Sequence, residues 1–279
     1  MNDTLRDAPL LIVDGDNLAH RAYHSTPKTV KNEAGESINA IVGFVNILVN
    51  VWRGEQPRGV FVAWDTLGVP TYRNELWPDY QGGRVFEPEI VRQLGLLPAV
   101  CEAFGFGVGK SAGSEADDLI AAAVVKELKR GGSCLVMTTD KDAYQLVGER
   151  VTVLGPQRGG ELARIGPAEV EERLGVLPEQ VPDFKALAGD SSDKIPGAKG
   201  IGGKTAAALL QRHGSLEEVI KAWDRHGEDE LVRKFKEMVV LRPKVAVTLP
   251  RTGVPDWKGG AAAVRRLGAN TLADRLEAM

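Results

Sequence analysis

The sequence predicts an α/β protein in which helices cover both faces of a central, mainly parallel sheet and a helical subdomain follows. Two observations carry this prediction. Up to about residue 155, short apolar runs rich in Val, Leu and Ile alternate with helical stretches, which is the pattern of a parallel sheet buried on both faces. From about residue 166 the strand-like runs largely stop, and short helical patterns replace them.

The elements of the first part follow in a regular order. We expect strands at residues 10–13, 59–64, 133–138 and 150–154, and helices at residues 38–52, 88–104 and 115–130. Residues 66–89 interrupt this order with basic and aromatic side chains, glycines and prolines, and predict a mobile loop beside the active site. Ligands of open α/β sheets collect at the carboxyl ends of the strands.

The second part is predicted to be helical. Its expected helices cover residues 167–174, 178–188, 204–213, 216–223 and 228–241. Residues 251–279 are weakly patterned apart from a short helix over 270–279. We therefore divide the chain into residues 1–165, residues 166–250 and a C-terminal tail, and expect the first two parts to pack together because no long linker separates them.

The composition limits the classes of protein to which the chain can belong. The chain has 279 residues, of which 43% are hydrophobic, so it can bury a sizeable core. Cys101 and Cys134 match no zinc or redox spacing and predict buried thiols in a reducing cytoplasm. The N-terminus lacks the pattern of a signal peptide, and no apolar run approaches membrane-spanning length.

Nine carboxylates are the most informative feature. They lie at the ends of strand-like runs or the starts of helical ones: Asp14, Asp65, Glu115, Asp117, Asp118, Asp140, Asp142, Asp190 and Asp193. Taken alone, residues 115–118 fit the acidic first turn of a helix, and residues 140–142 fit a turn with a cap. Because ionised carboxylates beside buried strands need a balancing cation, their convergence indicates bound Mg²⁺ or Mn²⁺.

Removing these nine charges from the net charge of −3 leaves +6, so the remaining surface can attract phosphate.

The stretch LAGDSSDKIPGAKGIGGKTAAALL has the pattern of a helix–hairpin–helix turn. Its glycines let backbone N–H groups approach a phosphate, and Lys194, Lys199 and Lys204 add positive charge. A tight helix–helix turn without a ligand is the alternative. Residues 104–111 and 198–205 resemble P-loops but lack the required first glycine, which excludes nucleoside triphosphate binding. The histidines form no triad and no metal pattern.

The ordered motifs resemble those of the 5′→3′ exonuclease and flap endonuclease family, particularly the N-terminal nuclease domains of bacterial DNA polymerase I. They are VDG at Asp14, WD at Asp65, YRNELWPDYQGGR, EADDL, TDKDAYQL and GDSSDKIPGAKGIGGKTA. The resemblance covers about residues 10–250 and implies a PIN-like α/β domain, a helical helix–three-turn–helix module and an arch, here about residues 66–105. Since no polymerase segment follows, we expect a free-standing nuclease or an isolated domain.

The resemblance also implies the site residues. Asp14, Asp65, Glu115, Asp117 and Asp140 would hold a first ion, with Asp118 nearby, and Asp142, Asp190 and Asp193 would hold a second. The catalytic set would be Asp14, Asp65, Arg73, Arg84, Glu115, Asp117 and Asp140. Two Mg²⁺ ions, for which Mn²⁺ can substitute, suit phosphodiester hydrolysis because one activates a water molecule and the other stabilises the leaving 3′-oxygen.

The implied partner is DNA with a 5′ end, a 5′ flap or a branch, held by its backbone without sequence readout. The expected contacts are Arg21, Tyr72, Arg73, Tyr80, Arg84, Lys199, Gly200, Gly202, Lys204 and Thr205. Tyr72, Trp77 or Tyr80 would stack on an unpaired base, with packing inside the loop as the alternative. In the family the glycine turn often carries K⁺. We expect a monomer in the bacterial cytoplasm, with no membrane or nucleoside triphosphate partner.

The chain departs from the family at Gln81, where a YKxxR pattern usually places a lysine that enters the active site. Glutamine cannot supply that charge, and Arg84 and Lys110 are the candidates to replace it. Asp16 is an extra acid beside Asp14, either a spare ligand or a helix cap. The predicted function is a structure-specific, metal-dependent 5′→3′ exonuclease or flap endonuclease in DNA replication or repair. The alternatives are a PIN-type ribonuclease, which the hairpin turn disfavours, and a catalytically weak branched-DNA binding module, which Gln81 suggests.

Overall fold

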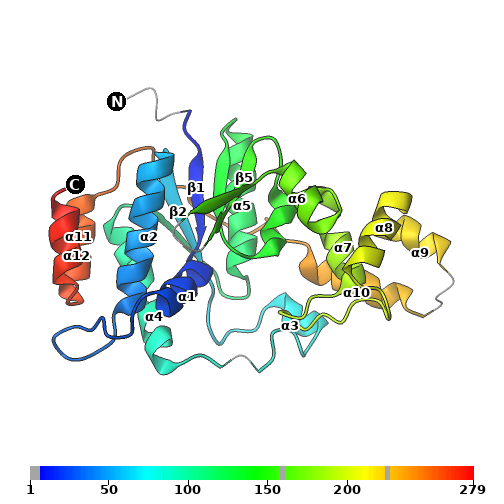
Figure 1. Ribbon diagram of the computed structural model, residues 1–279, viewed down its shortest axis with the longest axis horizontal. Coiled ribbons are helices and arrows are strands. Elements are labelled where there is room, and N and C mark those ends of the chain that lie inside the picture. Colours follow the sequence, from blue (N-terminus) through cyan, green and yellow to red (C-terminus); the bar gives the residue numbers. More distant parts are fainter. Residues whose placement is uncertain (1–6, 84, 158–160, 224–226) are drawn as a thin grey trace.

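A six-stranded sheet forms the centre of the molecule (Figure 1). The computed structural model describes residues 7–83, 85–157, 161–223 and 227–279. The strands are β1 (Leu10–Asp14), β2 (Gly59–Trp64), β3 (Gly107–Lys110), β4 (Cys134–Met137), β5 (Val151–Pro156) and β6 (Leu162–Ile165), in the spatial order β3-β2-β1-β4-β5-β6. Strands β1 to β5 are parallel, and β6 pairs antiparallel with β5. The predicted mainly parallel sheet is confirmed.

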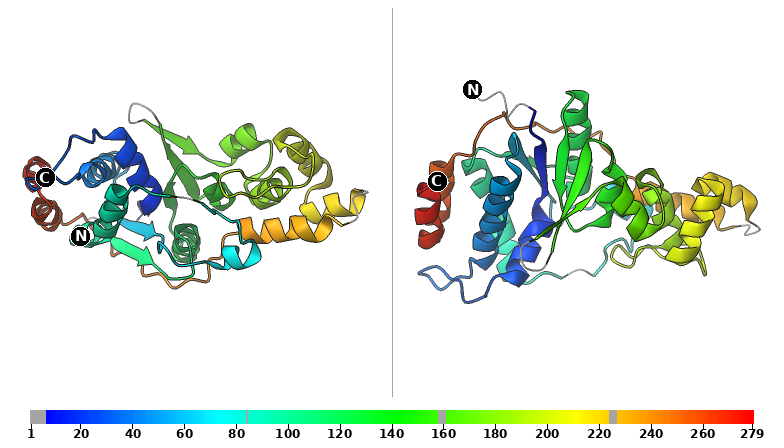
Figure 2. Two further views of the ribbon diagram at one scale, coloured as in Figure 1. Left: turned by 90° about the horizontal axis from the view of Figure 1, so that it is seen from below. Right: turned by 45° about the horizontal axis from the view of Figure 1, so that its top comes forward.

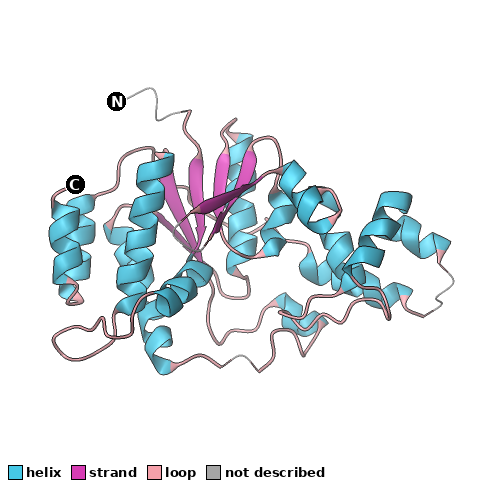
Figure 3. Cartoon of the chain, in the orientation of Figure 1, coloured by secondary structure: helices cyan, strands magenta, loops and turns pink. Residues whose placement is uncertain are grey.

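Helices cover both faces of the sheet (Figure 3). Every residue of β1 is buried, with Leu10 and Ile12 on one face and Leu11 and Val13 on the other, as the two-residue period of a strand requires. The first face packs against α5 (Ala116–Lys129). The second packs against α1 (Gly15–Ser25), α2 (Asn39–Glu55) and α4 (Pro88–Ala103).

The edge strand β3 was not predicted from the sequence. Its glycines remove the apolar pattern that marks the other strands, yet they are what allow it to pair with β2. A Cβ atom on Gly109 would lie 2.5 Å from Cζ of Phe61, which is too close for any larger residue at unchanged geometry. Part of the segment that resembles a P-loop is therefore a strand, closely packed on the ring of Phe61. Strand β6, only four residues long, was also missed.

Residues 72–80, part of the predicted loop, contain a short helix and two buried side chains. They begin with the short helix α3 (Tyr72–Leu76), whose start is fixed by a hydrogen bond of 2.9 Å from the N–H of Thr71 to Oδ1 of Asn74. Arg73 and Tyr80 are buried. The segment thus joins the core near the start of α5.

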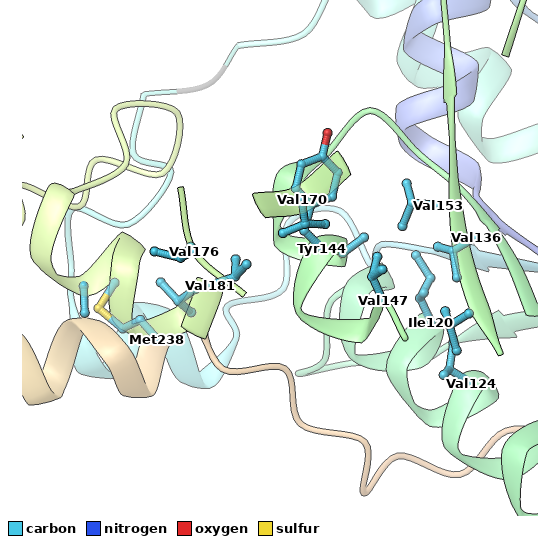
Figure 4. Packing of buried hydrophobic residues seen from close by; sticks show 14 of the residues in the cluster. Ile120, Val124, Val136, Tyr144, Val147, Val153, Val170, Val176, Val181 and Met238 are labelled. Carbon is cyan, nitrogen blue, oxygen red and sulfur yellow. The ribbon is translucent and has the colours of Figure 1, made fainter. Parts of the chain in front are cut away.

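The helical subdomain extends from one end of the molecule, as Figure 2 shows. It comprises α6 (Pro167–Leu174), the 3₁₀ helix η4 (Pro178–Gln180), α7 (Val181–Ala188), α8 (Gly203–His213), α9 (Leu216–Ala222) and α10 (Asp229–Val239). One apolar cluster runs from the sheet through Tyr144 and Val170 to Val181 and Met238 (Figure 4). The expectation that the two parts pack together is confirmed.

The C-terminal residues form two helices, α11 (Trp257–Arg266) and α12 (Asn270–Glu277), of which only the second was predicted. They lie at the opposite end of the molecule from α8 and α9 (Figure 1). Val264 and Leu272 are buried in the same cluster as α2 and α4. Helix α11 was missed because its core face is built from small residues; a Cβ on Gly260 would lie 2.1 Å from Cε1 of Phe104.

Both thiols are buried as predicted, and burial raises the pKa of each, that of Cys134 to about 12. In the part of the chain that the structure describes, no helix combines the length and the hydropathy of a membrane span.

Candidate functional site

A cavity of about 770 Å³ lies where β1, β2 and β4 end. Six carboxylates line it, and we call them the first acid group: Asp14, Asp16, Asp65, Glu115, Asp117 and Asp140. Five of the six were predicted from the sequence as ligands of one ion, and the structure brings them to one cavity. The sixth is Asp16.

Asp14 connects the end of β1 to Thr138, the residue that follows β4, through a hydrogen bond. It is the last residue of β1 and caps α1, because its Oδ1 accepts a hydrogen bond of 3.1 Å from the N–H of Asn17. Its Oδ2 accepts a bond of 2.8 Å from the hydroxyl of Thr138, which in turn accepts from the N–H of Asp140 at 3.1 Å. Burial raises the pKa of Asp14 to about 7, against the two hydrogen bonds and with the repulsion of Asp65 and Asp140.

Asp16 lines the cavity together with Asp14, but it does not cap α1, since Asp14 is the helix cap. The Asp16 carboxylate accepts a hydrogen bond of 2.7 Å from the N–H of Asp65. Burial, followed by repulsion from Asp65, raises the pKa of Asp16 to about 8, and Lys110 opposes that rise. Asp16 therefore fixes the backbone of a neighbouring acid and adds a carboxylate to the cavity.

The first turn of α5 is held by two other acids. Oδ1 of Asp65 accepts a hydrogen bond of 2.7 Å from the N–H of Ala116, which places a carboxylate at the positive end of the helix. Glu115 accepts from the hydroxyls of Thr71 at 2.9 Å and Tyr80 at 3.0 Å. Burial raises the pKa of Glu115 although Arg73 opposes the rise.

Asp117 and Asp118, both predicted at the metal site, have different surroundings. The carboxylate of Asp118 accepts bonds of 2.9 and 3.0 Å from Arg73 and a third, of 2.9 Å, from the N–H of Arg242. Asp118 is 1% exposed and does not line the cavity. Asp117 does, and burial together with the charges of Asp140 and Asp14 raises its pKa well above the usual range.

Three predicted DNA contacts pack against other parts of the protein in this structure. Arg73 is 2% exposed and paired with Asp118, so it cannot reach a phosphate from this position. Tyr80 is 5% exposed, with its hydroxyl on Glu115. The Tyr72 ring lies against the guanidinium of Arg242, 3.3 Å from its central carbon to the ring centroid. The partners of all three side chains lie outside the loop, at the start of α5 and just after α10.

Other side chains at the cavity are better placed to meet a ligand. Arg21 lines it, with its guanidinium donating to the carbonyl of Gln157 at 2.6 Å. Phe86 is 37% exposed, and its ring centroid lies 4.8 Å from that of His20. Phe86 was not predicted from the sequence because it lies just beyond the motif YRNELWPDYQGGR. Arg84, predicted as a catalytic and DNA-binding residue, lies outside the described residues.

The remaining predicted ligands, Asp142, Asp190 and Asp193, form the second acid group and are not among the cavity-lining residues. Asp142 belongs to the 3₁₀ helix η2 (Lys141–Leu146) and is hydrogen-bonded through its N–H to Asp140 at 2.9 Å. The Lys185 ammonium contacts Asp142 and lies 2.7 Å from Oδ2 of Asp190. The sequence analysis did not single out Lys185.

Lys185 shapes the charge of the second acid group. Burial raises the pKa of Asp142 to about 7 although Lys185 opposes it. Burial acts in the same direction on Asp190, but Lys185 and Ser192 outweigh it and hold that pKa at about 2. Burial lowers the pKa of Lys185, and the charges of Asp142, Asp140 and Asp190 more than reverse this effect and keep it above its usual value.

Gln81 connects the arch segment to both acid groups. Its side-chain amide donates to the Tyr80 hydroxyl at 3.0 Å and to Oδ1 of Asp193 at 3.1 Å. Its backbone adopts a φ of +50°. Gln81 is therefore a brace between the arch and the helical subdomain. Lys110, the proposed substitute for the missing lysine charge, is exposed at the end of β3.

The predicted turn is exposed and precedes a helix. Lys199, Gly200, Gly202, Lys204 and Thr205 are all exposed. Gly200 has a φ of +73°, which favours glycine, and Gly202 is the N-cap of α8. The backbone N–H groups at this helix start and the two lysines form a surface suited to a phosphate.

The donor set suits hard divalent cations. Carboxylate oxygens are the ligands that Mg²⁺ and Mn²⁺ prefer. A bound cation would offset the cost of burial and the mutual repulsion that raise the pKa values of Asp14, Asp16 and Asp117. Among the described residues, no three His, Cys, Asp or Glu side chains are yet gathered as a ligand cluster. The acids are thus chemically suited to cations without being preassembled around one.

Two models of protein domains match the sequence, one after the other. Residues 9–175 match the model of the N-terminal resolvase-like domain of 5′-3′ exonucleases, and residues 176–251 match that of their C-terminal SAM fold. The thermostable DNA polymerase I of Thermus thermophilus is 38% identical over 88% of this chain, and DNA polymerase I of Deinococcus radiodurans is 41% identical over 79%. The chain covers only 29% and 22% of these two relatives.

Solved structures agree on the fold. A zinc-bound T5 5′-exonuclease aligns with a TM-score of 0.69 and 22% identity over 96% of both chains. Flap endonuclease-1 of Methanococcus jannaschii aligns with a TM-score of 0.61 and 18% identity over 97% of this chain and 92% of that one. The predicted PIN-like fold with a helical second part is confirmed.

Proposed function

Since the chain belongs to the 5′-3′ exonuclease family, we propose that it is a structure-specific, metal-dependent 5′→3′ exonuclease and flap endonuclease. Its substrates are 5′ ends, 5′ flaps and branched or nicked duplex DNA in replication or repair. The observation that carries the proposal is the first acid group, six carboxylates around one cavity at the ends of three parallel strands. A monomer is sufficient for this activity.

The acid groups are the proposed cation ligands. Asp14, Asp65, Glu115, Asp117 and Asp140 would hold one Mg²⁺, with Asp16 as an added carboxylate, and Asp142, Asp190 and Asp193 would hold another. Mn²⁺ would substitute for either. When bound, such ions supply an activated water molecule and neutralise charge on the leaving oxygen. No side-chain nucleophile is needed, which fits a cavity lined by acids.

The remaining residues position the DNA. Arg21, at the rim, is suited to grip a phosphate because its guanidinium presents several donors in one plane. Phe86 offers an exposed ring to an unpaired base. The turn from Lys199 to Thr205 holds the duplex by its backbone, with K⁺ as a candidate ion there. Asp118 and Arg73 hold the start of α5 in place.

The test is cleavage of a 3′-labelled duplex that carries a single-stranded 5′ flap, in Mg²⁺, in Mn²⁺ and in EDTA. We expect cuts at or near the flap junction in both metals and none in EDTA. Asp140→Asn should abolish the cuts while flap binding persists. Full activity of this variant would refute the assignment of Asp140.

Two further outcomes would favour the alternatives. Equal or faster cleavage of an RNA flap of the same shape would indicate a ribonuclease. Tight flap binding without cuts in either metal would indicate a branched-DNA binding module, with Gln81 as the cause. Gln81→Lys should then restore cleavage, because it returns the positive charge to the arch.

A further inference from the structure

The second acid group already contains a cation, which the chain itself provides. Lys185 lies on α7, 6% exposed, with its ammonium on Asp142 of η2 and 2.7 Å from Oδ2 of Asp190. Asp142 is also 6% exposed. The ammonium is therefore enclosed between two carboxylates from different segments of the chain.

The third member of the group is held as well. Oδ1 of Asp193 accepts a hydrogen bond of 3.1 Å from Gln81, and the carbonyl of Asp193 accepts from the backbone N–H of Gln81 at 3.3 Å. The chain's own donors thus engage every carboxylate of the second acid group. In the first acid group, burial, followed by the charges of Asp140, Asp14 and Asp142, raises the pKa of Asp117.

An ammonium and a divalent ion on the same carboxylate oxygens would repel each other and compete for the same lone pairs. A divalent ion that binds Asp142 and Asp190 must first break both ion pairs of Lys185. Its apparent association constant is then the intrinsic constant multiplied by the fraction of molecules in which the ammonium has moved away. The smaller this fraction is, the weaker the apparent binding. In the first acid group, Oε1 of Glu115 lies 3.5 Å from Nη1 of Arg73, a guanidinium that is also paired with Asp118.

We infer that Lys185 is the resident counter-cation of the second acid group and competes with the second divalent ion. The inference rests on the proposed two-ion function. It makes binding at the second acid group conditional, because a divalent ion binds there only when Lys185 withdraws. Lys185 is thus a positioning residue that sets when the site becomes fully loaded.

The test is a Mn²⁺ titration of the full chain, followed by electron paramagnetic resonance of free Mn²⁺ and by calorimetry. Wild type should bind one ion more tightly than the next. In Lys185→Met the weaker ion should bind at least about tenfold more tightly, equivalent to about 1.4 kcal/mol. The variant should also unfold at a lower temperature in EDTA and recover more stability than wild type when Mn²⁺ is added.

Two controls make the result specific. Lys141→Met removes the same charge from an exposed position beside Asp142 and should leave the titration unchanged. Adding Asp142→Asn to Lys185→Met should abolish the gain in affinity. If Lys185→Met does not fold, Lys185→Gln carries the same expectation, because its amide can donate to both carboxylates without a charge.

Unchanged Mn²⁺ affinities in the Lys185 variants would overturn the inference and leave Lys185 as a purely structural ion pair. That outcome is distinct from failure of the proposed function. A wild-type chain that binds Mn²⁺ but never cuts flap DNA would refute the nuclease, whatever the Lys185 variants show. Flap cleavage by wild type together with unchanged Mn²⁺ binding in the variants would refute the inference alone.

Discussion

Adjacent side chains at the start of α5 face different neighbours, and their substitution should have opposite effects. Asp118→Asn breaks a buried pair with Arg73, so we expect a loss of about 3–5 kcal/mol in the free energy of unfolding. Asp117→Asn removes a charge repelled by Asp14 and Asp140, so stability in EDTA should stay equal or rise. Its cleavage rate should fall by at least about 100-fold, beyond the loss typical of residues behind a metal ligand. Urea unfolding and flap cleavage measure the two effects.

A reversal of the two phenotypes would contradict this assignment. If Asp118→Asn kept wild-type stability but lost cleavage, Asp118 would be a ligand, as the sequence suggested. The sequence could not identify the partner of Asp118, because spacing along a helix does not reveal which distant side chain each acid meets. What distinguishes Asp118 from Asp117 is its pair of hydrogen bonds with Arg73, which comes from a distant segment of the chain.

Phe86 is the aromatic side chain that the structure offers to an unpaired base. Phe86→Ala should weaken binding of a flap by about 1–3 kcal/mol, the usual value of one stacked base, and leave binding of a blunt duplex unchanged. Val85→Ala is the matched control, because Val85 is 91% exposed in the same segment. Fluorescence anisotropy with both DNAs tests this. Equal losses on the flap and the duplex would show that Phe86 supports the loop and not the base.

At the scale of the element, β3 depends on its glycines. Gly109→Ala would place a methyl group against the Phe61 ring, so we expect a loss of about 1–3 kcal/mol in the free energy of unfolding from overpacking. Gly54→Ala is the control: Gly54 is exposed in α2 with open space around it, and alanine should add about 0.5–1 kcal/mol. Chemical denaturation compares the two variants. A stabilising Gly109→Ala would mean that β3 can move away from the ring.

The elements that were predicted share one property. Strand β2 and helix α6 match their predicted ranges because a continuous apolar run or a clear start signal encodes them locally. Strand β3 and helix α11 were missed because their small residues are useful only where a neighbour approaches closely, at Phe61 and Phe104. Such approaches depend on tertiary packing, which a local pattern does not contain.

At the scale of the molecule, the sequence placed the acids but not their partners. The sequence predicts that Asp14, Asp65 and Asp140 meet, because parallel strands end at one edge of the sheet. The sequence does not predict that Lys185 enters the second acid group, because packing between the two parts of the chain brings α7 and η2 together. The predicted division at residue 165 remains a prediction, since one apolar cluster continues across it.

The C-terminal helices should stabilise the molecule without taking part in its chemistry. Val264, Leu272 and Leu276 are buried against the cluster that includes α2 and α4, and no proposed site residue lies beyond residue 250. Each such side chain contributes roughly 1.5–3 kcal/mol, so a chain that ends at residue 250 should lose more than about 3 kcal/mol in the free energy of unfolding. Its initial rate of flap cleavage per folded molecule should stay near that of the full chain, measured well below the melting temperature. An unchanged urea midpoint would show that α11 and α12 are dispensable, and a lost cleavage rate at full stability would place part of the DNA-binding surface on them.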